Sequence, residues 1–283
     1  MKDQDREACS LVALIVDMDD AAWCKSVDSG TAAGTAGVPC HNPVTLDGIL
    51  NGIVVFMNAV RMLNRENEVC IIGEYPDGVA RYLSGSGSDV GVKLKRSVRE
   101  YSKINPESSR QSSLSSALSK ALCYTNRVVN SHKIKYGTVP LARVLVIQAT
   151  EDTSSQYIAS MNAAFAAQKQ QVCVDVCDFS PGGSKVLQQV AHLTGGILQH
   201  YRGVSIGGFM EQLLGVFLSD KTTRGMLKLP PQAPIVLEAA CFCCGILRSR
   251  GWVCSVCLSV FCKDPRNKSS SCPTCKTRIQ VER

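Results

Sequence analysis

The sequence contains no apolar run long enough to cross a membrane. Its apolar runs, such as Leu11 to Val16 and Val144 to Ile147, fall far short of the roughly 20 residues that a transmembrane helix needs. The N-terminus carries mixed charge and no apolar signal-peptide segment follows it, so we expect a soluble intracellular protein. Only 19% of the residues are charged and 45% are apolar. This globular composition excludes an intrinsically disordered chain, a collagen and a coiled-coil rod.

Catalytic motifs are also missing. The chain has no phosphate-binding P-loop, no dinucleotide-binding glycine motif after a strand, and no HExxH zinc motif. Its four histidines are scattered along the sequence rather than grouped: His41, His132, His192 and His200. The sequence therefore predicts a protein that is not an enzyme.

Apolar runs and helical periodicities alternate along most of the chain. The continuous apolar run at 11–17 is typical of a strand buried on both faces, and hence of a parallel sheet. A short hairpin would place one antiparallel strand at an edge of this sheet. The sequence predicts an α/β fold with a doubly wound, mostly parallel sheet. Strands are expected at 11–17, 68–73, 79–83, 141–149, 171–177 and 197–201, with helices near 47–63, 114–128, 154–170, 184–194 and 205–218.

A proline-rich stretch from Lys228 to Pro234 marks a linker after this α/β region. We therefore divide the chain into three parts. Residues 1–219 form the α/β domain, 220–240 the linker, and 241–283 a small metal-binding domain.

The cysteines are concentrated in the last part. Eight of the fifteen lie in the final 43 residues, and the odd total argues against a disulfide framework. Cys254-x2-Cys257 and Cys272-x2-Cys275 are two pairs separated by fourteen residues. Each pair can grip one face of a tetrahedral metal, and four soft thiolates describe a structural zinc site. The sequence predicts that these four cysteines bind zinc.

Three upstream cysteines suggest half of a second zinc site: Cys241, Cys244 and Cys262. A cross-braced fold would take its fourth ligand from near position 265, but that residue is Pro265, and the tail contains no histidine. Cys243 could supply the fourth sulfur at an awkward bite angle. Alternatively, these cysteines pack as small buried hydrophobic side chains.

The tail also carries most of the net charge. Residues 241–283 account for +6 of the +7 of the whole chain. A basic tail suggests an acidic partner, either a protein surface or nucleic acid. Alternatively, the cations offset the −2 net charge of a zinc ion bound by four thiolates. The tail is also rich in apolar residues for its size, so some should face another surface.

Acidic residues follow two predicted strands, as Asp17-x-Asp19-x-Ala21 and at Asp152, and a serine run lies at 112–116. This constellation resembles the von Willebrand factor A fold, whose members bind a divalent cation through a D-x-S-x-S motif, a threonine and a distal aspartate. Here Ala21 removes one ligand and Asp19 adds a negative charge. The resemblance implies a degenerate cation site at Asp17, Asp19 and Asp152 that is empty. Otherwise these acids simply cap helices at the sheet edge.

The combination of such a domain with a prolyl linker and CFCC…GWVCSVCLSVFC…CPTC is similar to one family. It resembles the small von Willebrand A-type subunit of the core of the transcription and repair factor TFIIH. The resemblance implies a nuclear, non-enzymatic scaffold for transcription initiation by RNA polymerase II and for nucleotide excision repair. Its implied partner is the larger TFIIH subunit that also has an A-type domain and zinc modules. That pair supports the helicases, so contact with nucleic acid is expected to be indirect and contact with a membrane absent.

Two other functions remain open from the sequence. A RING-like finger could recruit a ubiquitin-conjugating enzyme, but the incomplete upstream cysteine set argues against this. The basic tail could instead be a zinc ribbon that binds nucleic acid directly. It offers few aromatic side chains for base stacking, namely Phe242, Trp252 and Phe261.

Overall fold

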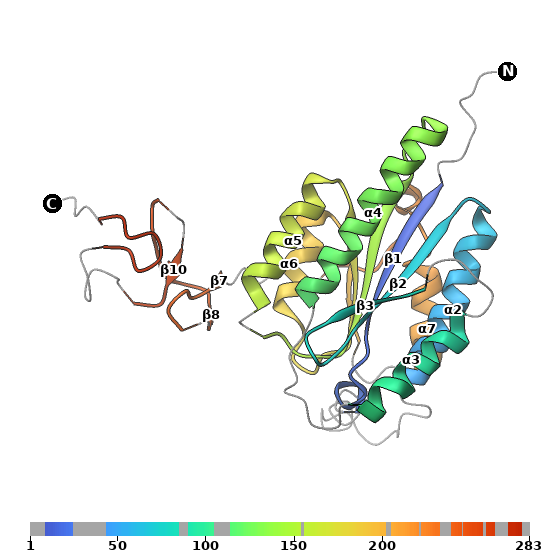
Figure 1. Cartoon of the computed structure of the whole chain (residues 1–283), viewed down its shortest axis with the longest axis horizontal. Helices are drawn as coiled ribbons and strands as arrows, with labels where there is room; N and C mark the ends of the chain where they lie inside the picture. Colours follow the sequence, from blue (N-terminus) through green and yellow to red (C-terminus); the bar gives the residue numbers. More distant parts are fainter. Residues whose placement is uncertain are drawn as a thin grey trace.

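The computed structural model of the chain contains an α/β domain and a cysteine-rich C-terminal segment (Figure 1). Several sequence predictions lie outside the described residues, including the loop at 26–42, Ser112, Ser113 and Cys257. The structure describes residues 9–24, 44–84, 90–104, 114–153, 156–201, 205–220, 222–232, 239–244, 246–256, 259–263 and 271–278.

The chain enters the sheet at its centre and builds outward in both directions. The strand order is β3-β2-β1-β4-β5-β6, with every neighbouring pair parallel except the antiparallel edge pair β2 and β3. The predicted doubly wound sheet and its antiparallel edge strand are therefore confirmed. The strands are β1 (Ser10–Asp17), β2 (Glu68–Glu74), β3 (Ala80–Ser84), β4 (Leu141–Gln148), β5 (Cys173–Asp178) and β6 (Leu198–His200).

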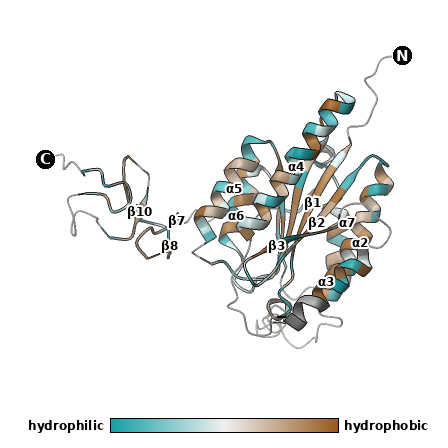
Figure 2. Ribbon diagram, in the orientation of Figure 1, coloured by the Kyte–Doolittle hydropathy of each residue, from teal (hydrophilic) through white to brown (hydrophobic). Residues whose placement is uncertain are grey.

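Helices cover both faces of the sheet and bury two apolar cores (Figure 1). Alternate side chains of β1 point to opposite faces. Leu14 therefore packs in the core with α2, α3 and α7, whereas Ile15 packs with α4, α5 and α6. Figure 2 shows hydrophobic residues along the strands and mixed hydropathy on the helices. The helices are α2 (Leu46–Leu63), α3 (Val90–Ile104), α4 (Leu114–Tyr136), α5 (Tyr157–Lys169), α6 (Lys185–Thr194) and α7 (Ile206–Gly215).

Capping residues set several helix ends. The Thr45 side chain accepts a hydrogen bond from the Gly48 N–H at the start of α2, and Ser184 does the same for Leu187 in α6. Gly195 ends α6 in the left-handed conformation, with a φ of 71° that glycine adopts without strain. Among the described residues, α2 is the one helix long and apolar enough to cross a membrane. Its apolar face lies in the core of the domain, as in a soluble core helix.

One helix was missing from the sequence prediction. A single helix was expected between the strands at 79–83 and 141–149, but α3 and α4 both lie there. In α3, Leu94 is fully buried and Val98 packs partly against the same core. This apolar stripe is narrow, and in the sequence it is interrupted by the cations Lys93, Lys95 and Arg96. In addition, the stretch before α3 is rich in glycine and serine, a composition typical of a loop.

The first part of the predicted linker contacts the α/β domain. A short 3-10 helix, η2 (Thr223–Met226), carries Arg224, whose guanidinium pairs with the buried Asp175 of β5 at 2.8 and 2.5 Å. Further along, Leu229 packs against the core that contains α7, and the Gln232 side chain accepts a hydrogen bond from the Leu198 N–H. Residues 222–232 thus lie on the domain, while the division at 219 and 240 stays a prediction.

Candidate metal centres

The cysteine-rich segment repeats one small backbone motif three times. In each copy a cysteine directly follows a strand residue, and its N–H donates to the carbonyl five residues later, at 3.0, 3.0 and 2.8 Å for Cys241, Cys254 and Cys272. Each of these is also the first cysteine of a C-x2-C pair. The three pairs therefore start in hairpins of the same geometry. The flanking pairings are β7 (Ala239–Ala240) with β8 (Leu247–Arg248), β9 (Trp252–Val253) with β10 (Val260–Phe261), and a bridge between Ser271 and Arg278.

Two of these hairpins bring one predicted zinc set together. The sulfur atoms of Cys254, Cys272 and Cys275 lie within 4.8 Å of one another, with Cys254 and Cys275 3.8 Å apart. The fourth predicted ligand, Cys257, lies outside the described residues. A zinc ion bound tetrahedrally at about 2.3 Å per sulfur requires sulfur separations of about 3.8 Å. We name these three residues the downstream cluster, and they could hold a metal ion.

The local hydrogen bonds of the downstream cluster suit a thiolate. N–H groups of Cys275 and then Thr274 face the Cys272 sulfur and lower the pKa of its thiol, although burial acts in the opposite direction. A thiolate, rather than a thiol, is the form that binds zinc. The donor set therefore fits zinc chemically.

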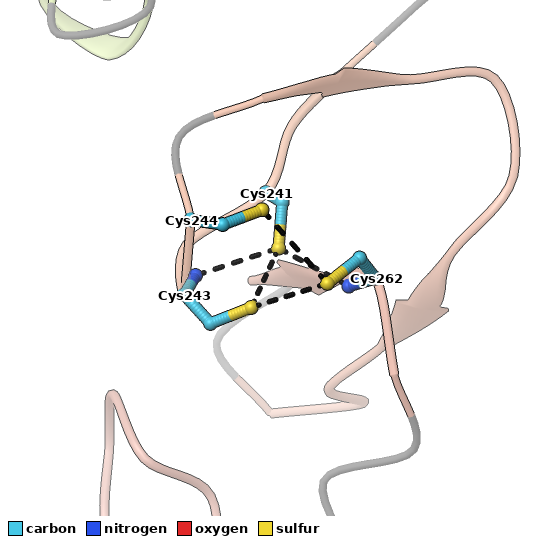
Figure 3. A group of neighbouring side chains, drawn as sticks. All are labelled: Cys241, Cys243, Cys244 and Cys262. Atoms are coloured by element: carbon cyan, nitrogen blue, oxygen red, sulfur yellow. Dashed lines mark hydrogen bonds between the residues drawn. The ribbon is translucent and has the colours of Figure 1, made fainter.

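A separate group, the upstream cluster, consists of Cys241, Cys243, Cys244 and Cys262 (Figure 3). All four sulfur atoms lie within 4.8 Å of one another. The sulfur of Cys243 lies 2.9 Å from that of Cys241 and 3.4 Å from that of Cys262, and Cys244 lies 3.8 Å from Cys262. The structure thus places Cys243 beside the three cysteines of the predicted half-site.

Hydrogen bonds within the upstream cluster converge on Cys241. Burial acts to raise the pKa of this thiol, but hydrogen bonds from the Cys243 side chain and from the N–H groups of Cys243, Cys244 and Cys262 lower it to about 6. The opposite shift occurs at Cys262. Hydrogen bonds with the neighbouring side chains of Cys243 and then Cys241 raise the pKa of the Cys262 thiol to about 12. One thiolate can thus form readily, while several thiolates together require a cation.

The two clusters interleave along the chain. Cys254 directly follows β9 and Cys262 directly follows β10, so both belong to the β9–β10 hairpin. Nevertheless, the sulfur of Cys254 lies in the downstream cluster and that of Cys262 in the upstream cluster. The last pair, Cys272-x2-Cys275, returns to Cys254. This alternation is the cross-braced arrangement of RING-like fingers.

The predicted cation-site acids do not converge. Among the residues that the structure describes, the two cysteine clusters are the groups of three or more possible metal ligands. The Asp17 carboxylate accepts hydrogen bonds from the Ala149 N–H, the Thr150 N–H and hydroxyl, and the Asp19 N–H. Asp152 instead accepts from Ser184 and from Val186, at the start of α6. Asp19 accepts from the N–H of Ala21.

These acids therefore bind backbone and hydroxyl donors at the ends of strands and the start of α6. Burial is the main influence on the pKa of Asp17 and raises it above its ordinary value, against its hydrogen bonds. The pKa of Asp152 is raised for the same main reason. In the fold these carboxylates accept local hydrogen bonds, and the empty cation site expected from the sequence stays a prediction.

Sequence reasoning missed another buried acid at the same sheet edge. Asp178 ends β5 and accepts hydrogen bonds from the Ser180 N–H and hydroxyl and from the Ser184 N–H, with His200 3.3 Å away. Burial acts to raise its pKa, but these bonds outweigh it, so the pKa of Asp178 lies below its ordinary value. The D-x-S spacing of Asp178 and Ser180 is the signal that could have found this tie.

Comparison with known proteins assigns this architecture. The family model described as "Transcription factor Tfb4" matches residues 86–276, which include both cysteine clusters. The chain belongs to the Tfb4 family.

Curated relatives of the Tfb4 family align along nearly the whole chain. The general transcription and DNA repair factor IIH subunit tfb4 of Schizosaccharomyces pombe is 29% identical over 96% of this chain and 90% of its own length. The subunit TFB4 of Yarrowia lipolytica is 34% identical over 95% and 86%. General transcription factor IIH subunit 3 of Dictyostelium discoideum is 34% identical over 86% and 70%. The alignments with the Schizosaccharomyces pombe and Yarrowia lipolytica subunits cover the α/β domain and the tail together.

A solved structure shares the fold of the α/β domain. The crystal structure of the TFIIH p34 N-terminal domain superposes with a TM-score of 0.61 at 22% identity, covering 73% of this chain and 97% of that chain. The α/β fold predicted for this Tfb4 family chain is thereby confirmed.

Proposed function

We propose that this chain is a non-enzymatic structural subunit of the TFIIH core. It acts in the nucleus, in transcription initiation by RNA polymerase II and in nucleotide excision repair. The observation that carries the proposal is the alignment of its α/β domain and cysteine tail together with curated subunits of factor IIH. The sequence adds support, since it offers no known catalytic motif.

The proposed partner is the larger von Willebrand A and zinc subunit, through which the chain joins the other core subunits and the helicases. The tail has the surface for such a contact. Its described apolar side chains are mostly exposed, and both residues of β9, Trp252 and Val253, are about half exposed. An exposed apolar group on so small a unit is typical of a protein interface. Among the described residues of the tail, the large exposed apolar side chains are Phe242, Ile246, Trp252, Val253 and Val256.

Zinc is the proposed cofactor of the downstream cluster, with Cys254, Cys257, Cys272 and Cys275 as ligands. Two hairpins would be held together by the ion, which supplies folding free energy that a 43-residue tail cannot obtain from burial alone. The proposed units are an α/β domain at 1–219, a linker at 220–240 and a zinc-finger domain at 241–283.

Co-purification of the full chain with the larger subunit tests the function. The wild-type chain should co-elute with it, and Trp252→Ser should weaken binding at least about tenfold, as for a central aromatic contact. Tyr136→Ser is the matched control, because Tyr136 is also an exposed aromatic side chain but lies in α4. Failure of the wild-type chain to co-elute would overturn the proposal.

One observation favours a second candidate. The interleaved clusters match a RING-like arrangement, which could serve a ubiquitin ligase component. Ubiquitin transfer with purified conjugating enzymes separates the two functions, since a structural subunit gives none. A zinc-ribbon role in nucleic-acid binding would instead appear as direct DNA binding that weakens steeply with salt.

A further inference from the structure

The upstream cluster has the spacing of a metal site rather than of a packed core. Tetrahedral zinc with four sulfur ligands needs separations of about 3.8 Å. The measured separations of 2.9, 3.4 and 3.8 Å lie at or below this value. Small outward movements of free thiols would therefore admit an ion among the four sulfur atoms.

Burial argues against the alternative of small hydrophobic packing. Cys241 is buried, but Cys243 and Cys244 are exposed and Cys262 is only partly buried. Cysteines that pack as hydrophobic residues are among the most buried side chains of a protein. Exposed thiols that gather in one place therefore need another reason to do so.

The backbone supports the same conclusion. The Cys241 N–H donates to a carbonyl at the same offset and nearly the same distance as in the two pairs of the downstream cluster. In addition, the N–H groups of Cys243 and Cys262 donate to the Cys241 sulfur, at 3.4 and 3.1 Å. Backbone donors of this kind stabilise a thiolate ligand. The Cys241–Cys244 pair is therefore shaped like the other two pairs.

Cys243 is the distinctive residue of this site. Its equivalents in the other two pairs are Val256 and Thr274, both of them exposed and neither able to bind zinc as a thiolate. Here the corresponding position carries a sulfur that approaches both Cys241 and Cys262 (Figure 3). Cys243 can therefore supply the fourth zinc ligand, which Pro265 cannot provide.

We propose that Cys241, Cys243, Cys244 and Cys262 bind a second zinc ion through four thiolates. Four soft ligands without histidine or an open position describe a structural zinc ion. The proposal depends on these sulfur atoms alone and is independent of which partner the chain binds.

Metal counting on the purified full chain tests the proposal. The wild type should contain two zinc ions per chain by elemental analysis and by native mass spectrometry. Cys262→Ser should lower this number to one or fewer, whereas Cys123→Ser should leave it at two, because Cys123 is an exposed cysteine in α4. A wild-type content of one zinc that Cys262→Ser leaves unchanged, or a content of two that it leaves unchanged, would overturn the proposal.

Cobalt substitution tests each cluster without depending on the other. The double variant Cys272→Ser/Cys275→Ser disables the downstream cluster and should still bind one cobalt ion with the spectrum of four sulfur ligands. Introducing Cys243→Ser into that variant should change the spectrum to three sulfur ligands and one oxygen. An unchanged spectrum would show that Cys243 is not a ligand and would refute the four-thiolate site. Absence of cobalt from the double variant, with zinc content of one in the wild type, would do the same.

Discussion

The ion pair between Arg224 and Asp175 offers the sharpest test of how the α/β domain is held together. Two nitrogen atoms of the guanidinium contact the two carboxylate oxygens, at 2.8 and 2.5 Å. The side chains are 9% and 1% exposed, respectively, so water cannot replace either partner. Arg224→Ala should therefore leave a buried charge on Asp175 without its ion-pair partner.

Removing one partner of a buried ion pair costs about 3–5 kcal/mol of the free energy of unfolding. The lower end applies here, because Asp175 keeps a hydrogen bond from the Ile197 N–H at 3.0 Å and is attracted by Arg143. We expect a loss of about 3 kcal/mol. With a urea slope of about 3 kcal/mol per molar, the midpoint should fall by about 1 M.

Urea denaturation followed by circular dichroism measures this loss. Lys169→Ala removes an exposed cation from the end of α5 and should change stability by no more than about 0.5 kcal/mol. Adding Asp175→Asn to Arg224→Ala removes the charge but keeps an acceptor for Ile197, so it should restore about 1 kcal/mol or more. The reasoning fails if Arg224→Ala behaves like Lys169→Ala, or if the double variant is less stable than Arg224→Ala.

Three further predictions follow from the same geometry. Ser184→Ala should lower the free energy of unfolding by about 1–2 kcal/mol, measured by thermal unfolding, and by more than Ser205→Ala does. Both hydroxyls cap a helix, but Ser184 also donates a hydrogen bond to the Asp152 carboxylate. Equal losses in the two variants would contradict this. Cys272→Ala should make the tail sensitive to protease, while the α/β domain keeps its melting temperature. The control variant Cys123→Ala should change neither property. A protease-resistant tail with full metal content in Cys272→Ala would refute the zinc assignment. The pKa of Asp178 is lowered in the folded state, so its charge stabilises the fold above the unfolded pKa of about 3.9, and this contribution is lost as the pH falls through the folded pKa. Asp178→Asn should therefore reduce stability at pH 7 and flatten its decline below about pH 4, and an unchanged acid profile would count against this.

The sheet could be predicted because its strands are strongly patterned. β1 and β4 contain the continuous apolar runs 11–16 and 144–147, and every residue of both runs is buried. The helix α3 could not be predicted in the same way, because among its described side chains Leu94 is the one that is fully buried, and Lys93 and Arg96 beside it are exposed. A helix that contributes a narrow apolar stripe is specified by its neighbours in space more than by its own periodicity.

The cysteine clusters show the same division between local and long-range information. Local spacing identified the C-x2-C pairs, since each pair begins with a cysteine in the same local hydrogen-bonding pattern. It could not place Cys243, because its approach to Cys262 depends on how two hairpins pack. Long-range packing also sets the contacts of the acids, because Asp17 and Asp152 accept hydrogen bonds from N–H and hydroxyl donors that lie far away in the sequence.

Burial in the tail explains why metal would govern its interface. Phe261 is the large apolar side chain that the described tail buries, whereas Trp252 stays about half exposed. Burying one phenylalanine contributes about 1.5–3 kcal/mol, far less than the apparent 10–16 kcal/mol of a structural zinc ion. The β9–β10 hairpin ends in Cys254 on one side and in Cys262 on the other, and these cysteines belong to different clusters. Loss of either ion would therefore release one side of the hairpin that presents Trp252, so partner binding should require both clusters to be filled.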